Sequence, residues 1–405
     1  MKIAVWYNLP SGGAKRALHD HLKGLVERGH TVEVWRPPIA QADYLPISER
    51  APEHVVPLGI PCGIPKGIVQ KIERRILVRQ AMREHSKAVA RQIADGGFDV
   101  LFANTCEIYH SPWIGRYLQM PKLLYLQEPQ RFLYEAQPRL PWVALPEGER
   151  RSWKPRAIAK RALDALNARA VRLQGADELQ NAQSFERILV NSNFSRESTL
   201  RAYGLDSEVC YLGIDASRFA NLGLPREPFA ISVGAFHPSK NPEFVIRAIG
   251  SIREGRPRLV WVANNAEPGY VERMRALAQG LQVELDLRQY IPDAELIDLL
   301  NRASVLAYAP RLEPFGYAPL EANACGCPAV VVAEGGVKES VREGINGVVV
   351  PHRPEAMGTA VADLLAHPDT TRAMGERAAA HVREAWTLER ATEELERHLR
   401  EVVGK

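Results

Sequence analysis

The sequence contains no apolar run of the length that a bilayer requires. A membrane-spanning helix needs about 20 consecutive apolar residues, and no stretch of the 405 residues approaches this. Cysteine is scarce and odd in number, which argues against a disulfide framework and favours a reducing cytoplasm. The five cysteines are scattered at Cys62, Cys106, Cys210, Cys325 and Cys327. A composition of 46% hydrophobic and 25% charged residues excludes disordered and fibrous classes. We expect a globular cytoplasmic protein.

Two motifs with functional meaning are also missing. No Asp-x-Asp pair occurs, so no carboxylate pair is evident for Mg²⁺ or Mn²⁺ on a diphosphate. No G-x-G-x-x-G follows the first predicted strand at residues 2–6, which disfavours a dinucleotide oxidoreductase. Cys325-Gly-Cys327 has no second pair and no nearby histidines, so we interpret it as two small buried thiols rather than a metal site.

Short apolar strands alternate with amphipathic helices along the chain, a pattern typical of parallel α/β units. Strands are predicted at residues 2–6, 31–35, 99–103, 123–126 and 188–191, and then at 229–233, 259–262, 283–287, 305–308 and 329–332. Helices are predicted at 14–28, 241–253, 270–279, 293–301, 319–325 and 354–366. The Pro- and Gly-containing stretch 222–228 separates the two groups. We therefore predict two doubly wound domains.

Charge is distributed unevenly between the two halves. Residues 1–180 carry 27 Lys and Arg against 18 Asp and Glu, a net charge of +9, whereas the remainder carries 25 against 30. Two basic segments, 66–91 and 150–172, lie in the first half. Such segments either bind an anionic membrane surface or are ordinary solvated helices packed on a sheet.

Residues 309–330 contain the most specific pattern in the chain. They read Ala-Pro-Arg-Leu-Glu-Pro-Phe-Gly-Tyr-Ala-Pro-Leu-Glu-Ala-Asn-Ala-Cys-Gly-Cys-Pro-Ala-Val, with Glu313 and Glu321 eight positions apart. A helix that begins near Tyr317 would direct free backbone N–H groups and its positive dipole end at an anion such as a diphosphate. Glu321 would lie about one turn inside this helix, where its carboxylate can accept hydrogen bonds from a ribose diol.

This segment resembles the E-x7-E signature of the retaining glycosyltransferases of family 4, which have the GT-B fold of two Rossmann-like domains facing each other across a cleft. Supporting matches cover most of the chain and are strongest in residues 229–350. They are Asn-Leu-Pro-Ser-Gly-Gly at 8–13, Arg-Gly-His-Thr-Val-Glu-Val at 28–34, Leu-Val-Asn-Ser-Asn-Phe-Ser-Arg at 189–196, Leu-Gly-Ile-Asp at 212–215, Val-Gly-Ala-Phe-His-Pro-Ser-Lys-Asn at 233–241, Tyr-Ile-Pro-Asp-Ala-Glu-Leu at 290–296 and Glu-Gly-Gly-Val-Lys-Glu at 334–339.

The resemblance implies roles for individual residues. Glu321 would bind the nucleotide ribose, Glu313 would contact the transferred sugar, and Lys240 would neutralise the departing diphosphate. The remaining donor-binding residues implied are the amide-bearing residues Phe315, Gly316 and Tyr317 and the N-terminal pair Gly12 and Gly13. No metal and no other cofactor would be required.

The chain departs from the family pattern at three places. Ala235 occupies the position where the family usually has an arginine. A cation that would bind the phosphate is therefore missing, or it is supplied by His237, Arg311 or Lys338. Residues 263–265, Ala-Asn-Asn, replace a usual glycine-rich turn. A histidine that often faces the donor sugar is absent from the loop that contains Gln127, Glu128 and Arg131. We consider Gln127 and Glu128 candidate sugar ligands and Arg131 a candidate acceptor ligand, with a plain polar loop as the alternative. His110 is interpreted as structural.

The domains predicted are 1–222 for the acceptor, 223–385 for the nucleotide sugar, and a final helix in 386–405 that crosses back to the first domain. The function predicted is metal-independent retaining transfer of a sugar from a UDP- or GDP-linked donor to a hydroxyl of a sugar, lipid-linked or small-molecule acceptor. We expect no nucleic-acid partner, and we leave open peripheral association with the inner membrane face. The alternatives are a sugar-nucleotide epimerase, a GT-B phosphorylase and a non-catalytic nucleotide-sugar binder.

Overall fold

The computed structural model describes residues 1–60, 68–135 and 155–404. The chain divides into two compact units. Unit 1 comprises Met1–Asn191, Ser195–Cys210 and Thr392–Lys405, and unit 2 comprises Ser192–Phe194 and Tyr211–Ala391. Cys62 and the first residues of the two basic segments, 66–67 and 150–154, lie outside the described residues.

Unit 1 is built on a parallel sheet with the strand order β3-β2-β1-β4-β5-β6-β7. Its strands are β1 (Lys2–Asn8), β2 (Thr31–Arg36), β3 (Glu53–Val55), β4 (Val100–Cys106), β5 (Lys122–Gln127), β6 (Arg187–Val190) and β7 (Glu208–Val209). Its α-helices are α1 (Gly13–Glu27), α2 (Ile68–Ala94), α3 (Arg131–Tyr134), α5 (Pro155–Ala182) and most of α6 (Asn193–Tyr203). The central strands are buried along their whole length because helices cover both faces of a parallel sheet.

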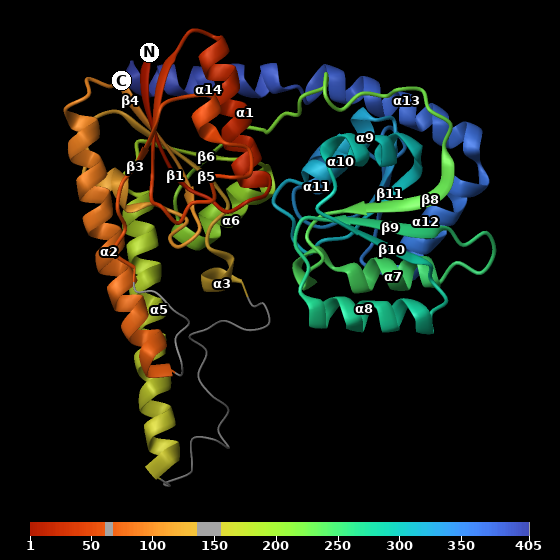
Figure 1. Cartoon of the computed structure of the whole chain (residues 1–405), viewed down its shortest axis with the longest axis horizontal. Coiled ribbons are helices and arrows are strands. Elements are labelled where there is room, and N and C mark those ends of the chain that lie inside the picture. The colour runs from red at the N-terminus through yellow and green to blue at the C-terminus, as the bar shows by residue number, and fades with distance from the viewer. Residues whose placement is uncertain (61–67, 136–154, 405) are drawn as a thin grey trace. The chain divides into compact units, whose positions relative to one another are not determined.

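Two features of unit 1 bear on function. The order of its strands reverses between β1 and β4, and such a switch point is where ligands bind in open α/β sheets. The two longest helices, α2 and α5, lie side by side and extend well beyond the sheet (Figure 1). These two helices contain the described parts of the predicted basic segments.

The C-terminal helix α14 (Leu388–Val403) packs on α1 in unit 1 through Thr392 and the residues after it. Gly24 of α1 lies against Thr392, and a Cβ on this glycine would approach the threonine hydroxyl oxygen to 2.2 Å. Glu396 of α14 pairs with Arg28 and with His30, whose Nε2 is 3.0 Å from the carboxylate. A close helix contact and a charged anchor thus fix the last turns of the chain in unit 1.

Unit 2 is built on a second parallel sheet with the order β10-β9-β8-β11-β12-β13, which reverses between β8 and β11. Its strands are β8 (Glu227–Val233), β9 (Arg258–Ala263), β10 (Leu285–Gln289), β11 (Ala303–Tyr308), β12 (Ala329–Val332) and β13 (Gly347–Val350). Its α-helices are α7 (Pro242–Gly250), α8 (Pro268–Gly280), α9 (Asp293–Arg302), α10 (Tyr317–Ala324), α11 (Val337–Ser340), α12 (Pro354–Ala366) and α13 (Pro368–Ala385). The two predicted Rossmann-like α/β domains are confirmed.

One strand starts later than its sequence predicts. Residues 283–287 were expected as a strand, but β10 begins at Leu285. The amide of Val283 instead donates to the carbonyl of Ala278, 2.8 Å away, in the last turn of α8. Val283 is buried in the core as part of the helix end, so its apolar side chain does not mark the strand.

Candidate functional site

The candidate site in unit 2 is built on the two strands that flank the reversal of strand order. Strand β8 leads through a turn to the 3-10 helix Pro238–Lys240, and β11 leads through residues 309–316 to α10. Strands β8 and β11 are neighbours in the sheet. The segments that carry Lys240 and Glu313 therefore leave the same edge of the sheet, at its switch point, where ligands of this architecture bind.

Lys240 and Glu313 form a close ion pair. The Nζ atom of Lys240 lies 2.7 Å from one carboxylate oxygen of Glu313 and 2.9 Å from the other. The Lys240 side chain remains 28% exposed and that of Glu313 14% exposed, so the pair is partly exposed rather than enclosed in the core. The structure thus brings together the two residues that were predicted to be catalytic.

Tyr308, at the end of β11, is a hydrogen-bond partner of Glu313. Its hydroxyl is hydrogen-bonded to the Glu313 carboxylate, and burial together with that negative charge raises the pKa of Tyr308 well above its ordinary value. The phenol therefore stays protonated and acts as a donor to the carboxylate. Tyr308 could not be identified from the sequence. A tyrosine at the end of a buried strand is common, and its contact with Glu313 depends on how the following loop folds back.

Glycines fix the backbone around Glu313. The amide of Gly336 donates to the carbonyl oxygen of Glu313 at 2.7 Å. A Cβ on Gly335 would approach that same oxygen to 2.3 Å, so only glycine permits this contact. Gly316 has φ of 92°, and its Cβ would lie 3.3 Å from the ring of Tyr308. The turn into α10 therefore depends on glycine for its left-handed backbone and for space.

Helix α10 begins at Tyr317, the start that was predicted for it, and Gly316 provides no side-chain cap for its amides. The first amides of such a helix lack intrahelical partners and favour an anion. Phe315 is buried, with its ring 5.6 Å from that of Tyr317 and 5.7 Å from that of Trp386. This aromatic packing holds the loop before the helix in place.

Glu321 lies in the second turn of α10 and is only 3% exposed. A buried carboxylate is costly unless polar groups surround it, so its neighbours must offset the cost of burial. The helix is held at its far end by Asn323, whose amide nitrogen donates to the carbonyls of Cys327 and Asn346, each at 3.0 Å. The helix is thus rigidly placed to present Glu321.

The candidates for the missing cation differ in their surroundings. Arg311 forms an ion pair with Glu334 at 2.8 Å. The imidazole of His237 accepts from the amide of Ser239 at 3.3 Å. Lys338 is exposed on the short helix α11. Ala235 lies in the turn after β8, two residues before His237. We leave the replacement among these three residues open.

The N-terminal candidates all lie in unit 1. Gly12 has φ of 145° just before α1, and no described atom lies within 4 Å of the Cβ it would carry. Gln127 ends β5 with φ of 61°, and its buried side-chain nitrogen has no hydrogen-bond partner among the described residues. Arg131 pairs with Glu135 at 2.8 Å and approaches Glu128 at 3.8 Å. Their relation to the donor site stays a prediction.

His110 and Glu178 connect the loops of unit 1. The Nδ1 atom of His110 lies 3.0 Å from the carbonyl oxygen of Glu128. Fully buried Glu178 accepts from the amides of His110 and Ser111 at 2.9 and 2.8 Å. Burial nevertheless raises the pKa of Glu178 to about 8. The sequence gives no signal for this carboxyl, because an Asp-Glu pair near the end of a long polar helix normally faces solvent.

Three negative findings concern the thiols, metal ligands and membrane-spanning helices. The four cysteines in the described ranges are buried free thiols, and burial raises the pKa values of Cys325 and Cys327 to about 12, so neither is reactive. In residues 1–60, 68–135 and 155–404, no three His, Cys, Asp or Glu side chains are grouped as metal ligands. None of the helices described is both long and apolar enough to cross a membrane.

Comparison with known proteins defines the class. The whole chain superposes on sucrose-phosphate synthase from Thermosynechococcus elongatus with a TM-score of 0.74, at 17% identity and full coverage of both chains. It also superposes on the Anabaena protein HepE in complex with UDP-glucose, with a TM-score of 0.67, 17% identity and coverage of 98% and 99%. With its two parallel-sheet α/β domains, the chain has the GT-B glycosyltransferase fold.

A family model also matches most of unit 2. Residues 214–381 match the model of the family Glycosyl transferases group 1. D-inositol 3-phosphate glycosyltransferase from Streptomyces bingchenggensis is 30% identical over 238 residues, which are 52% of this chain and 52% of that protein. The chain thus spans about half the length of the curated relatives it matches. The predicted resemblance to GT-B glycosyltransferases is confirmed.

Proposed function

We propose that the protein is a retaining, metal-independent glycosyltransferase that moves a sugar from a nucleoside diphosphate sugar to a hydroxyl acceptor. The observation that carries this proposal is the Lys240–Glu313 ion pair at the switch point, 2.7 Å apart and next to the uncapped start of α10. One cation, the amides at the start of α10 and two carboxylates are the groups that a diphosphate, a sugar and a ribose require.

Each group has a distinct task in this proposal. Glu321 accepts from the ribose hydroxyls, and the amides at Phe315, Gly316 and Tyr317 hold donor hydroxyls and phosphate. Lys240 exchanges its partner from Glu313 to the leaving diphosphate, which frees the carboxylate to accept from the sugar hydroxyls. Electrostatic stabilisation of the departing diphosphate by Lys240 replaces the metal that other transferases use.

Retention follows if the acceptor attacks on the face that the diphosphate leaves. The acceptor hydroxyl then passes its proton to the departing phosphate oxygen as the new glycosidic bond forms. We favour this route because the sequence offers no evident nucleophile for a double displacement. Gly12, Gly13, Gln127, Glu128 and Arg131 of unit 1 are assigned to the donor sugar and the acceptor.

The test is transfer of labelled sugar in excess EDTA. Because a relative in fold was solved with UDP-glucose, UDP sugars are the first donors to try, followed by GDP sugars. We expect label to reach an acceptor at an undiminished rate, with the anomeric configuration of the donor preserved in the product. Complete loss on chelation, restored by Mg²⁺ or Mn²⁺, would defeat the metal-independent mechanism.

The same assay separates the alternatives. An epimerase would change the donor sugar without passing label to a second molecule. A phosphorylase would require inorganic phosphate for turnover. A non-catalytic binder would bind the nucleotide sugar but would neither transfer nor hydrolyse it.

We also propose peripheral binding to an anionic membrane surface through the basic helices of unit 1. The exposed basic residues of α5 support this proposal, because cations near a surface of anionic lipid each contribute up to about 1 kcal/mol. They are Lys160, Arg169 and Arg172. Salt-sensitive sedimentation with anionic vesicles is the measurement that tests it.

A further inference from the structure

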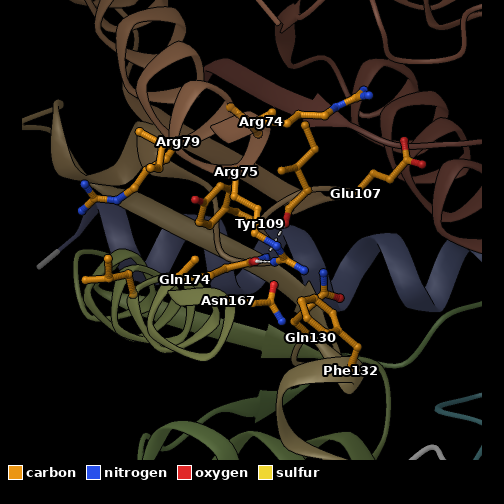
Figure 2. A pocket seen from close by; sticks show the side chains of 14 residues that line it. Arg74, Arg75, Arg79, Glu107, Tyr109, Gln130, Phe132, Asn167 and Gln174 are labelled. Atoms are coloured by element: carbon orange, nitrogen blue, oxygen red, sulfur yellow. Dashed lines mark hydrogen bonds between the residues drawn. The ribbon is translucent and has the colours of Figure 1, made fainter. Parts of the chain in front are cut away.

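A pocket of about 410 Å³ lies in unit 1. None of the residues assigned above to the donor or the acceptor lines it, although Gln130 and Phe132, the neighbours of Arg131, do. Helices α2 and α5 form two of its walls, and the segments that follow β4 and β5 close it (Figure 2). Glu107, Ile108 and Tyr109 come directly after β4, while Gln130 and Phe132 follow β5. These strands end at the carboxyl edge of the sheet, beside the β1–β4 switch point, where ligands bind in this architecture.

The walls of the pocket are mainly apolar, and its size falls in the range of about 300–1,000 Å³ that is typical of small-molecule sites. The apolar lining residues are Ile76, Val78, Ile108, Phe132, Ala170 and Leu173. The apolar surface continues outward onto the exposed faces of the two helices. Ile76 is 60% exposed and Leu173 45% exposed, although neither residue type is favoured at a solvated surface.

Arg75 brings a positive charge into this apolar setting. Figure 2 shows its guanidinium in the middle of the pocket, directed toward Gln174. The Nη1 atom donates to the Gln174 side-chain oxygen at 3.1 Å, and the guanidinium lies 6.0 Å from the ring centre of Phe132. No carboxylate in the described parts of the chain forms an ion pair with Arg75. Burial lowers the pKa of Arg75.

The neighbouring Arg79, on the same helix, differs from Arg75 because a carboxylate compensates its charge. Its guanidinium makes a two-pronged contact with Asp177, with hydrogen bonds of 2.5 and 2.9 Å. Asp177 is buried, and this contact raises the pKa of Arg79. One turn away, Arg75 has a neutral amide in place of a carboxylate. An anion from outside would supply the missing charge and would fit the two-pronged geometry of a guanidinium.

We propose that this pocket binds a lipid with a phosphate head group, with the phosphate on Arg75 and the apolar part against the walls between α2 and α5. An inorganic anion alone would leave the apolar walls and the exposed Ile76 and Leu173 unused, and a neutral amphiphile would leave Arg75 uncompensated. The identification of this lipid as the sugar acceptor rests on the proposed function, whereas the binding site itself does not.

The direct test is calorimetric titration with a short-chain phosphatidic acid, below the concentration at which it forms micelles and without any nucleotide. We expect saturable binding to one site. Inorganic phosphate and octyl glucoside, which carry only one half of the chemistry each, should both bind at least about 10-fold more weakly, since one charge-assisted contact or the apolar contact is lost.

Variants place the ligand in the pocket. Arg75→Gln should weaken binding of the phosphatidic acid at least about 10-fold. Arg91→Gln makes the same charge change at an exposed position of the same helix and should leave binding unaltered. Ala170→Phe should fill the pocket and abolish binding, whereas Ala165→Phe, at an exposed position of α5, should not. Thermal unfolding of each variant confirms that it is folded.

Three results would overturn the proposal: no binding of the phosphatidic acid, equal binding of inorganic phosphate, or binding that Arg75→Gln leaves unchanged. The outcome is separable from the proposed function. Loss of sugar transfer in a protein that still binds the lipid would count against the glycosyltransferase assignment alone. Sugar transfer by a protein that binds no such lipid would count against the pocket alone.

Discussion

The cations proposed to bind ligands in the two units have opposite surroundings. In unit 2, Lys240 is neutralised by Glu313 at 2.7 Å, and a ligand must take it over from an internal partner. In unit 1, Arg75 contacts the neutral side chain of Gln174 at 3.1 Å and no described carboxylate. A preformed ion pair keeps both partners oriented before the ligand arrives. At Arg75, an incoming anion would compete only with a hydrogen bond to a neutral amide, not with an ion pair.

Unit 1 also buries charges that serve the core rather than a ligand. The Nζ atom of Lys15 donates to the hydroxyl of Tyr7 at 2.8 Å, and this hydroxyl is bonded to Glu53 at 2.7 Å. Burial lowers the pKa of Lys15 to about 8. Because these three side chains satisfy one another's hydrogen bonds, we assign a structural role to them. Burial alone therefore does not separate a ligand site from the core.

The largest effect is expected when the Lys240 side chain is removed. Lys240→Ala should lower kcat about 10²-fold or more, the scale of losing one preorganised electrostatic contact to the departing group. Steady-state transfer assays measure this. Arg247→Ala is the control, because Arg247 is exposed on α7 and pairs with Glu243 of its own helix. An unchanged kcat for Lys240→Ala would show that the lysine does not act on the diphosphate.

A second test addresses the buried carboxylate of α10. Glu321→Ala should weaken nucleotide binding by about 1.5–3 kcal/mol, the usual contribution of a charge-assisted hydrogen bond. Calorimetry on the folded variant gives the affinity. Glu376→Ala on α13, which is exposed, is the matched control. Should Glu321→Ala bind nucleotide as tightly as the parent protein, the ribose assignment would have to be given up.

The third test concerns Glu178, a buried carboxyl with no cation beside it among the described contacts. Its pKa of about 8 lies above the ordinary 4.5, so the folded protein keeps a proton that the unfolded chain releases. Stability should therefore fall as pH rises between these two values, by at most about 1.4 kcal/mol per pH unit. Glu178→Gln cannot titrate and should flatten this slope.

Urea unfolding between about pH 5 and pH 8 compares the two proteins. Glu197→Gln, on the surface of α6, serves as the control and should keep the parental slope. Parallel stability curves for the parent and Glu178→Gln would mean that Glu178 is ionised throughout this range in the folded state.

The smallest effects are expected at the membrane surface. In the predicted basic segment of α2, Arg79 pairs with Asp177, and Arg83 lies 5.4 Å from the ring centre of Trp113. Both arginines therefore make contacts within unit 1, and we test the basic residues of α5 instead. Replacing Lys160, Arg169 and Arg172 of α5 by glutamine should weaken binding to anionic vesicles by up to about 1 kcal/mol for each cation. Sedimentation at low and high salt measures it, and nucleotide binding should be unaffected. Equal sedimentation of parent and triple variant would remove these residues from the interface.

The sequence by itself determined the two parallel-sheet domains and the position of the candidate donor segment. Alternating strands and helices are visible in local periodicity, and the start of α10 at Tyr317 follows from a glycine ahead of a helical pattern. The sequence did not predict the strands β3, β7 and β13 or the helices α6 and α13, and its predicted start of β10 was two residues early.

Only the tertiary structure decided which side chains are partners. Lys240 and Glu313 are 73 positions apart, and they meet because β8 and β11 are neighbours in the sheet. Tyr308 acts on Glu313 through a loop that folds back, and the pocket around Arg75 is assembled from α2, α5 and the ends of β4 and β5. Periodicity records which face of an element is buried, but strand order and helix packing determine what that face meets. The compensation of each charge is therefore a property of the fold and cannot be read from the local sequence.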